Sequence, residues 1–452
     1  MNSNNWKDTF RQVYKPLLKD KYDEFEEALA YPKSRHIRLN LSRQVDYLKE
    51  IKDYATFEEL ENYKGVYKIL EEKENLVNSL SFQTGGLYIM NPSSVIPAEI
   101  LSSYMAENPV VLDVCAAPGG KTCALSDYLN RKGLIIANEV SSSRLKSLHF
   151  NLEKNGCYNV KTVSFDGRVL NKFFKNSFDG ILLDAPCSNE NKIFRDKTVQ
   201  NIWNKDLVLK MANLQSQLIE TAFDCLKEGG ILVYSTCTLS VEENELVVKN
   251  LVDKYSNAKL LNIENFSGNG LSNYSEIDEK VARIMPTKTS IDGFFVAVIK
   301  KDGNLIKNEF KENKLSQKQK DFFKKYIDIV PENINILDIN GKGYIESGLN
   351  IFKKIPYKKI GLNVYKTAGK DFIPSAQFVW EFNRYIKDNE KIFVNKDNAM
   401  DYMKGFDLKP LKEYKGSVIY YDNIGVGLVK STNDTLKNKL DRYFLYGKNI
   451  EW

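Results

Sequence analysis

The chain has 452 residues, 42% of them hydrophobic. That length suffices for two or three domains with sizeable cores. No apolar run approaches the ~20 residues of a transmembrane helix, and the polar N-terminus lacks the apolar segment of a signal peptide. Six cysteines without a CxxC pair and only two histidines, His36 and His149, predict neither a disulfide framework nor a metal site. We expect a cytoplasmic protein without a membrane anchor or bound metal.

The net charge of +6 is unevenly distributed along the chain. Residues 303–452 contain 27 Lys and Arg against 19 Asp and Glu, a surplus of 8 positive charges, whereas residues 1–302 contain 38 against 40. Two interpretations stay open. The surplus is either a compositional bias with solvated lysines or a surface that binds a nucleic-acid backbone.

Residues 1–78 form a first region that we predict to be mostly helical. Apolar residues recur at intervals of three and four over residues 6–29 and again over residues 57–67, which favours helices. Residues 34–41 alternate and indicate a strand. Arg35, His36 and Arg38 are interpreted as surface residues, with RNA contact as the alternative.

Residues 79–302 show the alternation of a doubly wound α/β domain. A short helix is expected over residues 95–104, and helices are expected over residues 142–155 and 206–226. The expected strands are Val110–Val114, Leu134–Asn138, Val160–Ser164, Phe178–Leu183, Ile231–Ser235 and Gly293–Ile299. Alternation of this kind predicts a parallel sheet, whose ligands lie outside the carboxyl ends of its strands.

The turn after the first of these strands resembles a nucleotide-binding loop. Val110–Val114 is followed by Cys115-Ala-Ala-Pro-Gly-Gly-Lys-Thr122, and a helical pattern then runs to Leu129. Glycines allow a ligand to approach the backbone, and the helix N-terminus offers free N–H groups. The loop is neither GxGxxG nor a phosphate loop, because position 115 is Cys. A structural Gly-Gly turn is the alternative. The residues at the other strand ends therefore have to distinguish a ligand-binding loop from a structural turn.

Four carboxylates and two thiols stand at successive strand ends. Asp113 and Glu139 stand at the ends of the first and second strands, and Asp166 and Asp184 follow the third and fourth. Glu139 has the spacing of a ribose-binding carboxylate. Any one of these acids has an ordinary helix cap as its alternative role. The fourth strand leads into Asp184-Ala-Pro-Cys-Ser188, and the fifth leads into Ser235-Thr-Cys-Thr238. A cysteine at a ligand-binding edge is a candidate nucleophile as a thiolate.

These motifs together resemble the Nop/Sun family of RNA cytosine-5 methyltransferases. The resemblance rests on Asp113-Val-Cys-Ala-Ala-Pro-Gly-Gly-Lys-Thr122, Asp184-Ala-Pro-Cys-Ser188, Ser235-Thr-Cys-Thr238 and Gly293-Phe-Phe-Val-Ala297, and it covers about residues 80–300. Arg38-Leu-Asn40 and, more weakly, the tail from Gly425 to Asn438 are similar to the RsmF-type 16S rRNA enzymes. One departure concerns the loop after Cys187, where the family usually has Gly-Glu-Gly and this chain has Asn189-Glu190-Asn191.

The resemblance implies a class I, Rossmann-like methyltransferase domain and S-adenosyl-L-methionine as the cofactor. It implies that Cys237 is the nucleophile, that Cys187 assists product release and that Asp184 stabilises N3 of the target cytosine. The implied cofactor residues are Cys115, Ala116, Ala117, Pro118, Gly119, Gly120, Lys121, Glu139, Asp166 and Asp184. Lys121 has contact with RNA as an alternative role.

The remainder of the chain is expected to be a linker and an RNA-binding region. The Lys-rich residues 303–320 resemble a linker, and residues 321–374 look mixed. A helix is expected from Ser375, and a hairpin is expected from residues 418–421 and 424–429. The resemblance implies a small β-rich, PUA-like module over about residues 375–452.

Several functional alternatives stay open at this point. The implied substrate is 16S rRNA or the small ribosomal subunit, with tRNA as the alternative. Methyltransferases that act on an exocyclic amine require no cysteine nucleophile, and the fourth strand of their sheet usually ends in Pro-Pro-aromatic. Here Pro186 precedes Cys187. An RNA-binding assembly factor without catalysis would be favoured by loss of Cys237, which is present.

Overall fold

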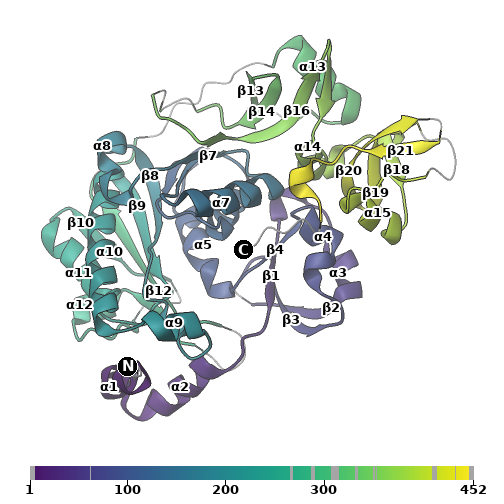
Figure 1. Cartoon of the computed structure of the whole chain (residues 1–452). Helices are drawn as coiled ribbons and strands as arrows, with labels where there is room; N and C mark the ends of the chain where they lie inside the picture. The colour runs from purple at the N-terminus through teal and green to yellow at the C-terminus, as the bar shows by residue number, and fades with distance from the viewer. Residues whose placement is uncertain are drawn as a thin grey trace.

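A single large sheet forms the centre of the molecule (Figure 1). The computed structural model describes residues 6–61, 63–264, 268–286, 291–306, 315–330, 334–349, 352, 354–409, 415–432 and 434–446. The strand order of the sheet is β10-β12-β9-β8-β5-β6-β7-β15, with β11 paired to β12. Its parallel strands are β5 (Val110–Asp113), β6 (Leu134–Asn138), β7 (Val160–Val163), β8 (Phe178–Asp184) and β9 (Leu226–Thr236). The antiparallel strands are β10 (Ala258–Leu261), β11 (Ala282–Ile284), β12 (Phe294–Lys301) and β15 (Lys359–Ile360).

Helices cover both faces of this sheet, as expected for a doubly wound fold. On one face lie α5 (Ile96–Ser103), α6 (Gly120–Tyr128) and α7 (Ser142–Lys154). On the other face lie α8 (Asn171–Phe174), α10 (Lys205–Cys225), α11 (Glu245–Lys254) and α12 (Ser275–Asp278). Most residues of the parallel strands are buried, because helices cover both faces of the sheet. The predicted α/β fold is confirmed.

The N-terminal region combines a helical pair with a small sheet. The helices α1 (Trp6–Leu18) and α2 (Tyr22–Ala30) pack against α9 (Lys197–Ile202) and the buried Trp203. A four-stranded sheet follows in the order β2-β3-β1-β4. Its strands are β1 (His36–Leu39), β2 (Ala55–Glu59), β3 (Val66–Glu72) and β4 (Leu87–Ile89), accompanied by α3 (Leu48–Tyr54) and α4 (Leu80–Gln83).

Three expectations for this region differ from the structure. The sequence predicts a helix over residues 57–67, but residues 57–59 lie in β2 and residues 66–67 in β3, where cross-strand pairing outweighs the apolar spacing. The region is therefore helical up to Ala30 and mixed beyond it, and β4 continues its sheet past residue 78. His36 and Arg38, predicted on the surface, are 1% exposed because β1 is the inner strand between β3 and β4.

The C-terminal region forms two further sheets. The first has the order β13-β14-β16-β17 and lies beside α13, and the second has the order β18-β19-β20-β21 (Figure 1). The first comprises β13 (Asn335–Ile339), β14 (Lys342–Glu346), β16 (Leu362–Ala368) and β17 (Asp371–Pro374). The second comprises β18 (Lys391–Phe393), β19 (Val418–Tyr421), β20 (Ile424–Thr432) and β21 (Thr435–Asn438). The helices are α13 (Gln317–Tyr326), α14 (Ala376–Glu381) and α15 (Lys396–Met403).

Most expected elements of the tail are present, and the expected linker is shorter than predicted. The hairpin of β19 and β20 turns at Asp422, and α14 begins after its N-cap Ser375 as expected. The predicted linker ended at residue 320, but α13 begins at Gln317 behind the capping box of Ser316. Residues 307–314 of that linker lie outside the described residues.

Buried ion pairs tie the three regions of the chain together. The Glu381 carboxylate, at the end of α14, lies 3.2 Å from Arg43 of the N-terminal region and 3.7 Å from Arg131 of the central domain. Arg38 Nη1 donates a 2.6 Å hydrogen bond to Asp127 Oδ2 of α6, and both side chains are 1% exposed. A buried charge that lost its partner would be strongly destabilising, so these pairs fix how the regions meet.

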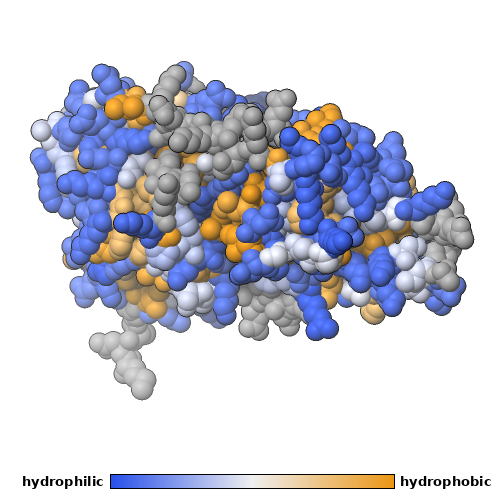
Figure 2. Space-filling model, turned by 90° about the horizontal axis from the view of Figure 1, so that it is seen from above, coloured by the Kyte–Doolittle hydropathy of each residue, from blue (hydrophilic) through white to orange (hydrophobic). Residues whose placement is uncertain are grey.

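Hydrophilic side chains cover most of the face shown in Figure 2, and hydrophobic ones gather near its middle. Within the described ranges, no helix combines the length and apolarity needed to cross a membrane. In the same residues, no group of three or more His, Cys, Asp and Glu side chains is placed to hold a metal ion.

Candidate active site

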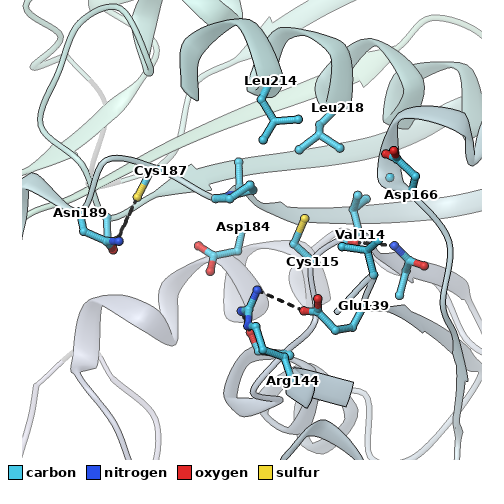
Figure 3. Close-up of a pocket in the computed structure, with 17 residues that line it drawn as sticks. Val114, Cys115, Glu139, Arg144, Asp166, Asp184, Cys187, Asn189, Leu214 and Leu218 are labelled. Atoms are coloured by element: carbon cyan, nitrogen blue, oxygen red, sulfur yellow. Dashed lines mark hydrogen bonds and ion pairs between the residues drawn. The ribbon is translucent and has the colours of Figure 1, made fainter. Parts of the chain in front are cut away.

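A pocket of about 520 Å³ opens at the carboxyl ends of the parallel strands (Figure 3). Residues after β5, β6, β7, β8 and β9 line it, and Leu214 and Leu218 of α10 form one wall. Of the predicted site residues, the lining includes Cys115, Ala117, Glu139, Asp166, Asp184, Cys187 and Cys237. The predicted residues Ala116, Pro118, Gly119, Gly120 and Lys121 lie outside the lining, in the turn and the first residues of α6.

The glycine turn has the geometry that the sequence suggests. Gly119 adopts a left-handed φ of 112° as the N-cap of α6, and a Cβ there would lie 3.1 Å from Leu148. A residue with a side chain is strained in this conformation, whereas glycine is not. The turn places Cys115 and Ala117 at the pocket, while Gly119 packs closely against α7.

Glu139 is a buried carboxylate with two protein partners. Only 3% of the residue is exposed, its Oε1 accepts a 2.8 Å hydrogen bond from the Ser141 backbone N–H, and its Oε2 lies 3.3 Å from Arg144. Arg144 also donates a 2.6 Å hydrogen bond to the carbonyl of Ala117, and thereby links the second strand end to the glycine turn. These contacts fix the carboxylate at the pocket wall, as Figure 3 shows.

Asp166 and Asp113 occupy opposite environments. Asp166 caps the turn after β7 and pairs with Arg168 at 2.5 Å on the protein surface, and the hydrogen bonds from Arg168 lower its pKa. Asp113 is buried and accepts a 2.7 Å hydrogen bond from Thr122, and burial raises its pKa to about 7. Asp113 does not line the pocket, so it supports the turn from beneath.

The two predicted thiols lie next to each other. Cys187 Sγ, after β8, is 3.2 Å from Cys237 Sγ, after β9. The hydrogen bond from Cys187 lowers the pKa of Cys237, and the same bond together with burial raises the pKa of Cys187. A thiolate therefore forms more readily on Cys237, which is the property required of a nucleophile.

Asp184 joins the thiols to the glycine turn. Its Oδ2 lies 2.7 Å from Lys121 Nζ, and its Oδ1 accepts a 3.0 Å hydrogen bond from Ser235 Oγ. Burial opposes the charge of Lys121, but the carboxylate of Asp184 outweighs this effect and raises the lysine pKa. Lys121 is thus paired with Asp184 in the structure, which favours a role in positioning the Asp184 carboxylate over a direct RNA contact.

The loop after Cys187 is held by its central glutamate. Asn189 has a left-handed φ of 57°, a conformation that glycine adopts freely and asparagine tolerates. Glu190 is 1% exposed and accepts hydrogen bonds from Tyr14 at 2.5 Å, Trp203 at 3.0 Å and Thr238 at 2.9 Å. The two asparagines therefore stand in a loop whose path is fixed by Glu190, and α1 reaches that loop through Tyr14.

Sequence reasoning missed three groups at this site. Arg144 stands in the first turn after Glu139, and its proximity in sequence was an available signal. The amide of Asn189 contacts both thiols, with Oδ1 3.1 Å from Cys237 Sγ and 4.0 Å from Cys187 Sγ. Glu243 accepts hydrogen bonds from Ser188 and Gln215, and burial raises its pKa to about 7. No local pattern marked the last two groups, because Cys237, the nearer thiol to Asn189, and Ser188 and Gln215, the partners of Glu243, are distant in sequence.

Comparison with known protein families gives a match over the catalytic domain. Residues 100–300 match the family model described as 16S rRNA methyltransferase RsmB/F. This range includes the glycine turn, both thiols and all of β12 except its last residue.

Individual relatives cover more of the chain. Ribosomal RNA small subunit methyltransferase F of Psychromonas ingrahamii is 32% identical, and the match spans 85% of this chain and 84% of that protein. The protein of the same name from Shewanella oneidensis is 31% identical over 93% and 92% of the two chains. A solved structure of a methyltransferase homologue from Pyrococcus horikoshii is 31% identical, with a TM-score of 0.58 and coverage of 66% of this chain and 96% of that one.

Proposed function

The chain belongs to the RsmB/F family of RNA methyltransferases, and from this premise we propose that it methylates C5 of a cytosine in 16S rRNA. It is an S-adenosylmethionine-dependent enzyme with a Rossmann-like domain. The choice of 16S rRNA is supported by the names of its relatives and by the length over which they match. A cytoplasmic location follows from a ribosomal substrate and is part of the proposal.

The residues of the pocket fit S-adenosylmethionine, which supplies an electrophilic methyl group when it is bound. A buried carboxylate such as Glu139 suits ribose hydroxyls, and Cys115 and Ala117 of the turn after β5 line the same pocket. We assign Cys115, Ala117, Glu139 and Asp166 to cofactor binding as pocket residues, whereas residues 118–121 shape the turn that carries them.

The observation that carries the proposed chemistry is the pair of thiols 3.2 Å apart beside Asp184. Cytosine C5 is a weak nucleophile until a thiolate adds at C6 and makes the ring an enamine. We assign this addition to Cys237, because Cys187 donates a hydrogen bond that stabilises its thiolate. After methyl transfer to C5, a base removes the C5 proton and the Cys237–C6 bond breaks, and we assign assistance in that release to Cys187.

Asp184 is assigned to the pyrimidine N3. Its carboxylate lines the pocket next to both thiols, and Lys121 and Ser235 hold it in place. When it carries a proton, this carboxyl group can donate a hydrogen bond to N3 and so stabilise the negative charge that develops on the ring as the thiolate adds at C6. A base can reach this position only if it is unpaired or turned out of a helix.

The basic C-terminal region is assigned to RNA binding. Its β20–β21 hairpin has the exposed Lys430 and Lys437 directly opposite each other, with Lys439 two residues further along. Like charges in cross-strand positions repel and lower stability. Phosphate contacts would compensate for that cost, so the hairpin supports the interpretation of the charge surplus as an RNA-binding surface.

Trapping with RNA that contains 5-fluorocytosine tests the proposed function. The C5 fluorine cannot leave as a cation, so methylation through a C6 adduct ends in a stable covalent complex. We expect such a complex with 16S rRNA. A covalent complex with tRNA alone would identify tRNA as the substrate. Methylation without any covalent complex would favour an exocyclic amine as the methylated group. Absence of both would favour a non-catalytic assembly factor.

A further inference from the structure

We propose that Asn189 is a positioning residue whose side-chain carbonyl holds the Cys237 thiol in its neutral S–H form in the free enzyme. The inference rests on the proposed role of Cys237 as the nucleophile. Asn189 Oδ1 lies 3.1 Å from Cys237 Sγ, with the thiol as the donor. This contact involves a residue that stands where the resembled family usually has glycine, which has no side chain to make it.

The backbone places the amide firmly over the thiols. Asn189 lines the pocket and caps the short turn Glu190–Lys192 in a left-handed conformation. Glu190 is fixed by three side-chain hydrogen bonds, and the Asn191 side chain accepts a 2.9 Å hydrogen bond from the backbone of Gly293. Because both following residues are held by hydrogen bonds, the loop backbone that carries the Asn189 side chain is fixed next to the thiols.

The three groups form a directed chain of hydrogen bonds. The Cys237 thiol donates to Asn189 Oδ1 at 3.1 Å. Because a thiol has a single hydrogen, the 3.2 Å hydrogen bond between the two sulfurs is then donated by Cys187. A carbonyl oxygen stabilises the S–H that it accepts and repels the lone pairs of a thiolate at the same distance. Asn189 therefore opposes the effect of Cys187, which favours the thiolate.

The other charged groups around Cys237 come from neighbouring elements. Lys121 of α6 and Lys192 of the loop after β8 favour the thiolate, whereas Asp184 at the end of β8 disfavours it. These groups remain in place when Asn189 is replaced, so the contribution of the amide can be measured by difference. The expected consequence is that the enzyme holds a smaller fraction of reactive thiolate until the RNA base enters the pocket.

The test is the pH dependence of Cys237 alkylation by iodoacetamide in the free, full-length enzyme, resolved by peptide mass spectrometry. Asn189→Gly keeps the left-handed backbone and removes the amide. We expect its alkylation midpoint to move to lower pH, with roughly a three- to tenfold larger thiolate fraction below the midpoint, the value of one hydrogen bond. Asn189→Asp keeps the shape, adds an anion and should move the midpoint to higher pH.

The midpoint, rather than the plateau rate, is the quantity to compare, because removal of a side chain also widens access. Asn273 offers a matched control, since it is exposed and has a left-handed φ of 67° remote from the pocket. Asn273→Gly should leave the Cys237 midpoint unchanged. An unchanged or higher midpoint in Asn189→Gly would overturn the proposal. Alkylation requires no RNA, so failure of the trapping experiment would be a separate result.

Discussion

At the scale of single residues, Glu139 is the side chain on which cofactor binding should depend most. It is buried, held by Arg144 and Ser141, and directed at the pocket. We expect Glu139→Gln to weaken S-adenosylmethionine binding by roughly 1.5–3 kcal/mol for each charged hydrogen bond lost. Calorimetry measures this directly. Asp166→Asn is the comparison and should lose less, because Asp166 is partly exposed and paired with Arg168. Equal losses of cofactor affinity in the two variants would contradict the assignment of Glu139 to the ribose.

Asp113 should make the stability of the fold depend on pH. Its folded pKa of about 7 lies above the ordinary value of 3.8, mainly because the carboxyl is buried. Between these values the folded chain retains a proton that the unfolded chain releases, so the free energy of unfolding should fall as pH rises. The full effect is roughly 4 kcal/mol above pH 7. Denaturant unfolding of Asp113→Asn should lack this part of the slope, and parallel profiles for the two proteins would contradict it.

The sequence was informative about residues at strand ends and uninformative about contacts between distant loops. Gly119, Glu139, Asp184 and the two thiols were predictable, because a parallel sheet brings its strand ends to one edge. Asn189 was recognised only as a departure from a family pattern. Its contact with Cys237 depends on the left-handed turn and on Glu190 binding Tyr14, 176 residues away in sequence.

At the scale of elements, β15 shows that the C-terminal region is part of the catalytic sheet. Lys359 and Ile360 pair with Thr162 and Lys161 of β7 and extend the sheet at its edge. Two residues of strand are too short to leave a recognisable pattern, so this pairing could not be predicted from sequence. Strands such as β5 and β6 were predictable because their apolar runs are continuous. The mixed spacing of residues 57–67 suits either a helix or a strand.

A buried ion pair between β7 and β14 should contribute strongly to the stability of the fold. Lys161 Nζ lies 2.6 Å from Glu346 Oε2, and their side chains are 5% and 3% exposed. We expect Glu346→Ala to cost about 3–5 kcal/mol of unfolding free energy, because Lys161 then stays buried without its partner. The double variant Lys161→Met with Glu346→Leu should recover most of the loss in denaturant unfolding.

The exposed pair of Lys259 and Asp302 supplies the control for that experiment. Its atoms are 2.9 Å apart, but 63% and 38% of the two side chains are exposed. Lys259→Ala should therefore cost less than about 1 kcal/mol. An equally small loss of unfolding free energy in Glu346→Ala would show that the Lys161–Glu346 pair does not anchor the C-terminal region to the catalytic sheet.

At the scale of the whole molecule, RNA affinity has to be tested without removing the C-terminal region. Its deletion would take away β15, Glu346 and Glu381 and would expose buried surface of the catalytic domain. Substitution of surface lysines avoids this. We expect the triple change of Lys430, Lys437 and Lys439 to Ala to weaken RNA binding and to reduce the salt slope by about 2 to 3.

A matched triple variant makes that test specific. Three exposed lysines lie near the amino ends of parallel strands, at the end of the sheet away from the pocket. They are Lys132 before β6 and Lys172 and Lys175 before β8. Their replacement by Ala removes the same charge but should leave RNA affinity and its salt dependence almost unchanged. Titrations over a range of salt concentrations compare the two variants. Equal losses would mean that only the overall charge matters and that the hairpin is not the binding surface.

The central claim concerns the division of labour between the two thiols that the fold brings to 3.2 Å. Each is replaced by Ala, and the protein is incubated with substrate RNA and S-adenosylmethionine and run on a denaturing gel. Cys187→Ala should methylate the RNA but fail to release it, leaving a covalent complex that disappears on RNA digestion. Cys237→Ala should give neither methylation nor a complex. A stable complex from Cys237→Ala and none from Cys187→Ala would contradict the assignment.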